Sequence, residues 1–168
     1  MATFLTRAPA GFPGAITRPD ETVVESAMMN PAPDKVPRAF GDIVKMVDGK
    51  LERLETGDTG AQVYGILART TPSIAGDMGQ TFNDATPNPQ QLQGVVVKGY
   101  VNVVCYSGGQ PVRGTPVYFR TNSNAAGTEP PGLISSQKSS ANFVEIPGAI
   151  WAADGKDSDK SAEIRLRV

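Results

Sequence analysis

The chain has 168 residues, of which 16 are basic and 17 acidic, so its net charge is −1. This length predicts one domain with a substantial core, and the 18 glycines and 14 prolines indicate many turns in a chain that is still globular. The balanced charge gives no basic stripe for nucleic acid, and no apolar run approaches the ~20 residues of a membrane span. The first residues lack the pattern of a signal peptide. We therefore expect synthesis in a cytoplasm, with neither nucleic acid nor a membrane as partner.

Residues 1–40 are predicted to form an extended, proline-rich arm. Six prolines between Pro9 and Pro37 fix φ and remove backbone donors, which disfavours a long helix or a central strand. Within the arm, residues 20–30 combine acidic residues after Pro19, typical of a helix start, with Thr22-Val23-Val24, typical of a strand. We expect this segment to be extended. Short apolar pieces punctuate the arm, and they suit a segment that lies on another surface.

Short strands are predicted from residue 41 onward. Residues 41–47 and 50–54 flank Asp48-Gly49, and a type I′ hairpin turn needs φ > 0 at both of its central residues, which these two tolerate. The next strand is expected at 63–69. Residues 70–93 are rich in proline, glycine, asparagine and glutamine, and predict a long loop of a kind that often contacts a partner.

The clearest strand is predicted between residues 94 and 106. Val97, Val101, Val103 and Cys105 share one face and Lys98, Tyr100 and Asn102 share the other, a period of two that marks a half-buried strand. A returning strand at 112–120 should turn Val117 and Phe119 inward. After a loop at 121–132, further strands are expected near 133–136, 143–152 and 163–168. The pattern predicts an all-β fold, a single compact β-barrel or β-sandwich over residues 41–168, with a jelly roll among the arrangements it leaves open.

The residues that usually perform catalysis are scarce. The chain has no histidine, the commonest general base and metal ligand. Cys105 is the single cysteine, and we expect it to be a small buried hydrophobe. Asp154, Asp157 and Asp159 could hold Ca²⁺ in principle, but they do not match an EF-hand and lysines interleave with them, so a solvated hairpin tip is expected. Trp151 is expected in the core or at an interface. We therefore predict no catalytic residue, no cofactor and no metal site.

The order of several short motifs along the chain resembles that of a known family. They are Gly-Phe-Pro-Gly from Gly11, Ile-Thr-Arg-Pro up to Pro19, Phe-Gly-Asp-Ile-Val from Phe40, Lys-Leu-Glu-Arg-Leu from Lys50, Thr-Gly-Asp-Thr from Thr56, Val-Tyr-Gly-Ile-Leu-Ala-Arg from Val63, Val-Lys-Gly-Tyr-Val-Asn-Val from Val97, Arg-Gly-Thr-Pro-Val-Tyr-Phe-Arg from Arg113 and Ile-Pro-Gly-Ala from Ile146. In this order they resemble the structural cement (capsid decoration) proteins of tailed bacteriophages. The resemblance covers nearly the whole chain and is weakest in residues 70–93 and 121–142.

The resemblance implies a β-rich, non-catalytic protein on the outer face of the virion. Such a protein binds the assembled shell of major capsid protein, stabilises it against the pressure of packed DNA, and forms oligomers, either dimers or trimers, at capsomer junctions. We expect Phe4, Leu5, Phe12 and Ile16 of the arm to contact the capsid or a neighbouring subunit. The alternative is that the arm covers an edge strand of its own domain.

Three other functions remain open from the sequence. A carbohydrate-binding module on the virion surface would need exposed aromatic side chains in a row, for which Tyr100, Tyr106 and Tyr118 are candidates. A carboxylate-based hydrolase would need a defined acid pair, and no such context is evident. A head–tail connector would need helices, and a tail-tube protein ring-closing hairpins.

Overall fold

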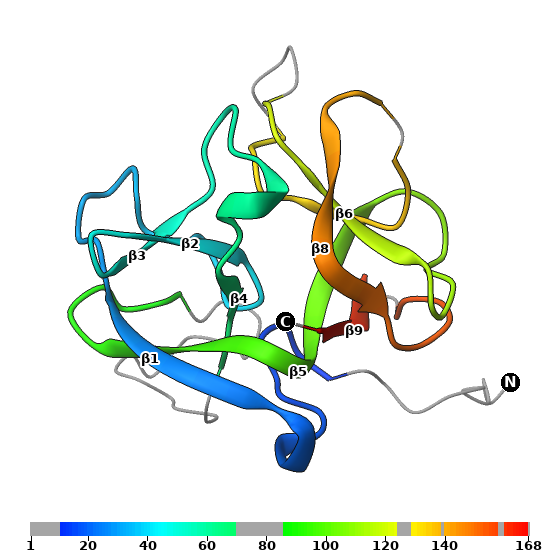
Figure 1. Ribbon diagram of the computed structural model, residues 1–168, viewed down its shortest axis with the longest axis horizontal. Helices are drawn as coiled ribbons and strands as arrows, with labels where there is room; N and C mark the ends of the chain where they lie inside the picture. The colour runs from blue at the N-terminus through cyan, green and yellow to red at the C-terminus, as the bar shows by residue number, and fades with distance from the viewer. Residues whose placement is uncertain (1–10, 70–85, 124–128, 139, 158–159, 168) are drawn as a thin grey trace, which may run out of the picture.

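The computed structural model describes residues 11–69, 86–123, 129–138, 140–157 and 160–167. The described chain is almost entirely β, with two short 3₁₀ turns (Figure 1). The elements, in chain order, are η1 (Pro19–Glu21), β1 (Val23–Met29), β2 (Ile43–Val47), β3 (Lys50–Arg53), η2 (Gly60–Gln62), β4 (Gly65–Leu67), β5 (Leu92–Ser107), β6 (Pro116–Arg120), β7 (Ile134–Ser135), β8 (Phe143–Trp151) and β9 (Ser161–Leu166). No helix in the described part of the chain is long and apolar enough to cross a membrane.

The C-terminal strands close into a barrel. Strand β5 pairs with β7, β7 with β6, β6 with β8, β8 with β9, and β9 again with β5. The interior is filled by side chains that alternate along each strand, among them Val101, Phe119, Trp151 and Ile164, none of which is exposed to solvent. We call this unit the C-terminal barrel. The all-β prediction is confirmed, and of the barrel and sandwich expected from the sequence, the structure is a barrel.

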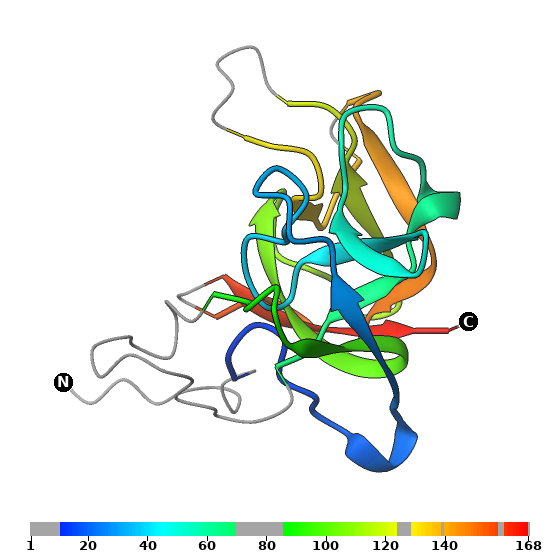
Figure 2. The ribbon, with the colours of Figure 1, turned by 90° about the vertical axis from the view of Figure 1, so that its left-hand side faces the viewer.

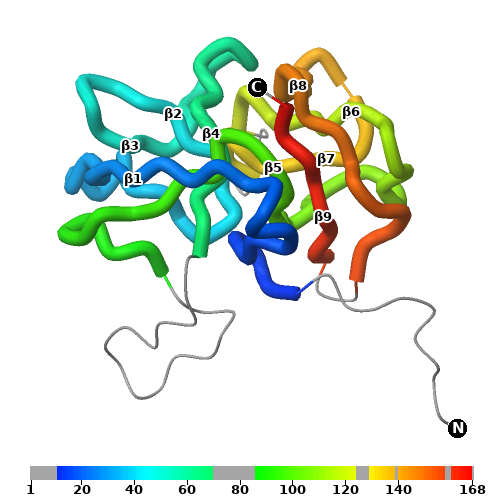
Figure 3. The backbone as a smooth tube through the Cα atoms, turned by 60° about the horizontal axis from the view of Figure 1, so that its bottom comes forward, coloured from blue at the N-terminus to red at the C-terminus, as the bar shows by residue number. Residues whose placement is uncertain are grey.

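The remaining strands pair in a second closed order, which we call the N-terminal ring. Strand β1 pairs with β3, β3 with β2, β2 with β4, β4 with β5, and β5 with β1. Each strand contributes one fully buried side chain to a separate small core, namely Met29, Leu51, Val44, Leu67 and Val95. Figures 1 and 3 show this ring to one side of β5 and strands β6, β8 and β9 to the other.

Strand β5 belongs to both units and changes direction between them (Figure 1). Val95 and Val97 pack in the N-terminal ring, whereas Val101 and Val103 pack in the C-terminal barrel. The change falls near Gly99, whose φ is +112°, a conformation open to glycine but costly for other residues. The sequence correctly predicted an inward face for Val101, Val103 and Cys105. The prediction of a half-buried strand was wrong at Tyr100 and Asn102, which are 8% and 0% exposed, and Val97 packs in a different core from Val101.

The predicted turns and inward-facing residues agree with the structure. Asp48 and Gly49 both have positive φ, 48° and 75°, at the turn between β2 and β3. Val117 and Phe119 of β6 are fully buried. Cys105 is also buried, and this burial raises the pKa of its thiol. The expectation of an extended conformation within residues 20–30 is confirmed by β1, which is a strand of the sheet.

The segment before β1 packs against the rest of the chain. Ile16 forms an isolated antiparallel bridge with Val101 and packs on the barrel core. The backbone N–H of Gly14 donates to Asn102 O (2.8 Å), and Arg69 N donates to Gly14 O (2.7 Å). Residues 14–17 therefore pair with the edge of β5 opposite β9. The division of the chain at residue 40 stays a prediction.

Candidate interaction surface

The four residues predicted as partner contacts do not form one exposed group in the described structure. Phe4 and Leu5 lie outside the described residues. Phe12 is half-buried, with the guanidinium carbon of Arg69 4.9 Å from its ring centroid, and Ile16 packs on the barrel core. Phe12 and Ile16 thus make contacts within their own chain. Their role in binding a partner stays a prediction.

The acidic loop before β9 is held by backbone and side-chain hydrogen bonds. Asp154 Oδ1 accepts from Arg113 N (2.8 Å), and Asp157 N donates to Ser161 O (2.9 Å). Asp159, the third predicted carboxylate, lies outside the described residues. Among the residues that the structure describes, no group of three or more Asp, Glu, Cys or His side chains is placed to bind a metal ion.

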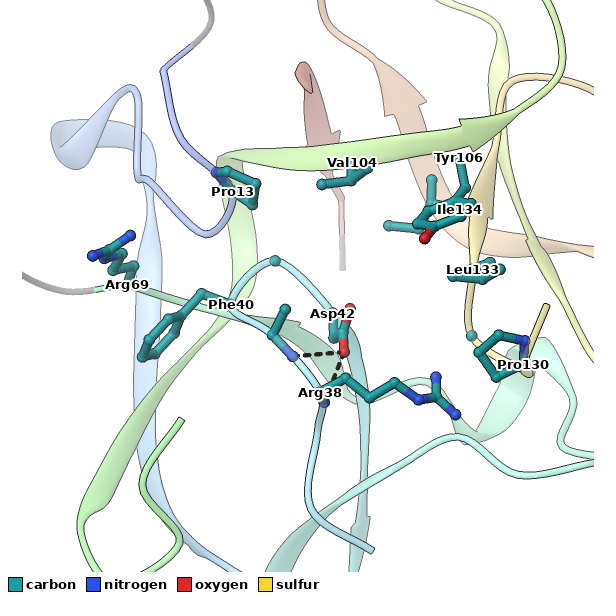
Figure 4. Close-up of a pocket in the computed structure, with 13 residues that line it drawn as sticks. Pro13, Arg38, Phe40, Asp42, Arg69, Val104, Tyr106, Pro130, Leu133 and Ile134 are labelled. Carbon is teal, nitrogen blue, oxygen red and sulfur yellow. Dashed lines mark hydrogen bonds between the residues drawn. The ribbon is translucent and has the colours of Figure 1, made fainter. Parts of the chain in front are cut away.

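A cleft of about 250 Å³ separates the turn at residues 38–42 from residues 130–134 (Figure 4). Its walls are mainly apolar, and Asp42 points into it. Asp42 Oδ2 accepts from the backbone N–H groups of Arg38 (3.0 Å) and Ala39 (3.1 Å), while burial raises the pKa of this carboxyl group. Arg38 reaches across and donates to Pro131 O (3.2 Å). Arg38 therefore connects the two walls, whereas Asp42 fixes the turn to which it belongs.

The three tyrosines considered for carbohydrate binding are not equally accessible. Tyr100 is only 8% exposed, with Arg18 3.9 Å and Arg165 5.3 Å from its ring centroid. Tyr106 is half exposed and Tyr118 is half-buried on β6. With Tyr100 covered by two guanidinium groups, the three side chains cannot present a continuous row of open rings.

A cluster of ion pairs fixes the loops beside β2 and β3. Lys45 Nζ donates to Asp58 Oδ2 (2.8 Å) and to Glu55 Oε2 (3.0 Å), and Lys35 Nζ donates to Glu55 Oε1 (2.6 Å). Asn30 Nδ2 donates to Glu52 Oε1 (2.6 Å). We call these groups the lysine–carboxylate cluster. It ties the segments around residues 30–35 and 55–58 to the hairpin and keeps that side of the N-terminal ring rigid.

Exposed apolar side chains gather on the outer face of the N-terminal ring. Met28 of β1 and Leu92 of β5 are register partners and are 40% and 67% exposed. Met28 also pairs with Lys50 of β3, which in turn pairs with Val47 of β2, itself 38% exposed. We call Met28, Leu92 and Val47 the apolar row. Sequence reasoning missed it, because the pairing that brings β1, β3 and β5 together is not visible in any local pattern.

Comparisons with known proteins agree with the architecture. A family model described as "Structural cement protein (E217 gp24/Pam3 gp6)" matches residues 2–167. Among solved structures, a chain from the capsid of Myoviridae phage XM1 is similar, with a TM-score of 0.68, 15% sequence identity, and coverage of 98% of this chain and 94% of that one. This likeness shows a shared fold. No curated protein matches the chain. The match over almost the whole sequence shows that the chain belongs to the structural cement protein family and has a structural role in the phage capsid.

Proposed function

We propose that the protein binds the outer surface of the assembled shell of major capsid protein and stabilises it against internal DNA pressure. The observation that carries this proposal is the family match over residues 2–167. A ligand that binds the assembled shell and not its dissociated subunits stabilises the shell by mass action. Repetition of the contact over the shell makes modest individual affinities sufficient.

The architecture suits a bracing role. Both units are closed by strand pairing, so few backbone groups are left at free edges, and each unit has its own buried core. A protein of this kind resists deformation when its neighbours move. In this proposal it acts as a dimer or trimer at capsomer junctions and catalyses no reaction.

The arm contributes to binding in this proposal, through Phe4, Leu5, Phe12 and Ile16. Deletion of residues 1–18 would be a poor test, because it also removes the bridge from Ile16 to Val101 and the bond from Gly14 to Asn102. The double variant Phe4→Ser/Leu5→Ser avoids these contacts. Weaker shell binding by this variant, with unchanged thermal stability, supports the arm's role, whereas undiminished binding contradicts it.

Co-sedimentation tests the function itself. Purified protein is mixed with expanded and with unexpanded shells of the phage, prepared without this chain, and its mass in solution is measured alongside. We expect saturable binding to expanded shells and a higher temperature of shell disruption when the protein is bound. A failure to sediment with either kind of shell would refute the proposal.

A further inference from the structure

The N-terminal half of β1 has one open edge. Ala27 and Glu25 are register partners of Gln93 and Val95 on β5, and Gly94 O accepts from Ala68 N on the opposite side (2.8 Å). In this part of β5, the odd-numbered residues therefore direct their hydrogen-bonding groups toward β1. Because these groups alternate along a strand, Val24 and Ser26 direct their N–H and C=O groups away from β5.

Strand β3 covers this edge only at the C-terminal end of β1. It pairs with Met28 and Met29, and Asn30 N donates to Leu51 O (2.9 Å). No described residue hydrogen-bonds to Val24 or Ser26 from this side. In Figure 2, η1 lies at the lower margin of the molecule and β1 rises from it toward the middle. Within the described part of the chain, four backbone groups, two donors and two acceptors, are thus left without a partner at an exposed strand edge, which is a template for an added strand.

Apolar side chains flank the open edge. Val24 is 37% exposed and Met28 is 40% exposed, and as alternate residues of one strand they lie on the same face. Leu92 lies opposite Met28 on β5 and is 67% exposed. An added strand would gain main-chain hydrogen bonds at Val24 and Ser26, and a side chain on its matching face would contact Val24.

A second copy of this chain does not fit the edge. Antiparallel self-pairing that joins Val24 to Ser26 of the copy sets the two Glu25 residues opposite each other, and like charges in that position are destabilising. Centring the pair on Ser26 instead sets Val24 against Met28, whose edge β3 already occupies. Centring it on Val24 sets Ser26 against Thr22, whose N–H is bonded to Pro19 O (3.2 Å).

We propose that the open edge of β1 receives an extended segment of the major capsid protein as an additional antiparallel or parallel strand. This inference rests on the proposed function and specifies the surface of this chain that binds the capsid protein. The segment has an apolar residue beside Val24. Opposite Glu25, whose carboxylate already accepts a hydrogen bond from the Tyr64 hydroxyl, it has a basic or hydroxyl residue that complements the charge. In strand addition, main-chain bonds supply affinity and the alternate side chains supply specificity.

A proline substitution tests the backbone contact. Ser26 directs its N–H outward, so Ser26→Pro leaves the bonds to β5 in place and is tolerated at an edge, and the preceding Glu25 is already extended, as proline requires. The matched control is Ser26→Ala, which keeps the N–H. We expect the proline variant of the full chain to bind expanded shells at least about tenfold more weakly and the alanine variant to bind as the wild type does.

Side-chain substitutions and hydrogen exchange provide independent tests. Val24→Asp, at a 37% exposed valine on the open edge, should weaken binding, while Val112→Asp, at a 56% exposed valine on the segment before β6, should not. In the wild-type protein, deuterium uptake by the peptide that contains Val24 and Ser26 should slow when shells are bound. This hydrogen-exchange measurement on the wild-type protein tests the inference even if the Ser26→Pro variant does not fold.

Three results would overturn the inference. One is equal binding by Ser26→Pro and wild type, and another is unchanged deuterium uptake at β1 on the shell. A third is loss of a dimer in solution by Ser26→Pro while shell binding persists, which would identify a second copy as the occupant. Each of these leaves the proposed function standing if the wild-type protein binds shells; absence of wild-type binding refutes the proposed function and the inference together.

Discussion

Lys45 Nζ lies 2.8 Å from Asp58 Oδ2, and the two side chains are only 9% and 10% exposed. Asp58 also accepts from Glu55 N (2.7 Å) and from Gln62 Nε2 (3.0 Å). A charge pair buried to this degree depends on each partner, because the loss of one leaves the other charge uncompensated in a poorly solvated position. The pair is the centre of the lysine–carboxylate cluster.

Replacement of Lys45 should therefore destabilise the fold strongly. We expect Lys45→Met to lower the free energy of unfolding by about 2–4 kcal/mol, because Asp58 loses its charged partner while staying buried. Urea unfolding followed by circular dichroism measures the change. Lys50→Met, at an exposed lysine of the same hairpin, is the control and should stay within about 0.5 kcal/mol of wild type. Similar effects of the two substitutions would contradict the role given to the cluster.

The same cluster predicts a loss of stability in acid. Hydrogen bonds from Lys35 and then Lys45 lower the pKa of Glu55 below its usual value of 4.5. A carboxyl group whose pKa is lowered by folding stabilises the protein above its unfolded pKa, and this contribution is lost as the pH falls through the folded pKa. Stability should decline below about pH 5, and Glu55→Gln should make the decline shallower. Parallel pH profiles of wild type and variant would refute this assignment. Asp42 acts in the opposite sense, since its raised pKa makes ionisation unfavourable to folding.

Gly99 should not tolerate a side chain. A Cβ built there would lie 2.4 Å from Thr22 Oγ1 and 2.6 Å from Glu21 O, in addition to the strain of its positive φ. We expect Gly99→Ala to cost about 3 kcal/mol or more. Gly114 also has positive φ but has nothing within 4 Å of a built Cβ, so Gly114→Ala should cost only about 1 kcal/mol. Thermal unfolding of both variants separates crowding from backbone strain, and equal costs would show that crowding at Gly99 is unimportant.

Cys105 should be unreactive in the folded protein. Its side chain is fully buried in the barrel and burial raises the pKa of the thiol, so little reactive thiolate is present. Labelling by a thiol reagent at pH 8 should be slow in native buffer and fast in guanidinium chloride. Rapid labelling without denaturant would mean that the barrel opens readily around β5.

Local patterns predicted the strands well and their assembly poorly. Alternation at Val101, Val103 and Cys105 predicted an inward face, and Asp48-Gly49 predicted a hairpin, because both signals are carried by neighbouring residues. The second closed ring depends on β1 pairing with β3 and β5, residues far apart in the chain. No period in the sequence encodes such pairing, so the N-terminal ring was not anticipated.

For the interaction surface too, local patterns were predictive and long-range strand pairing was not. The sequence singled out apolar residues in the arm, but Ile16 packs on its own barrel. Exposure at Met28 and Leu92 could not be predicted, because both look like ordinary strand residues until their partners are known. The Thr22-Val23-Val24 motif did indicate a strand in this region. Which edge of that strand would remain open is decided by where β3 ends.

The sharing of β5 has a mechanical consequence. The C-terminal barrel and the N-terminal ring are built on one continuous run of backbone, so a load applied to either half passes to the other through covalent bonds as well as through side-chain packing. In the proposed role at capsomer junctions, a protein built in this way would transmit strain between its two halves, where a pair of flexibly linked modules would absorb it.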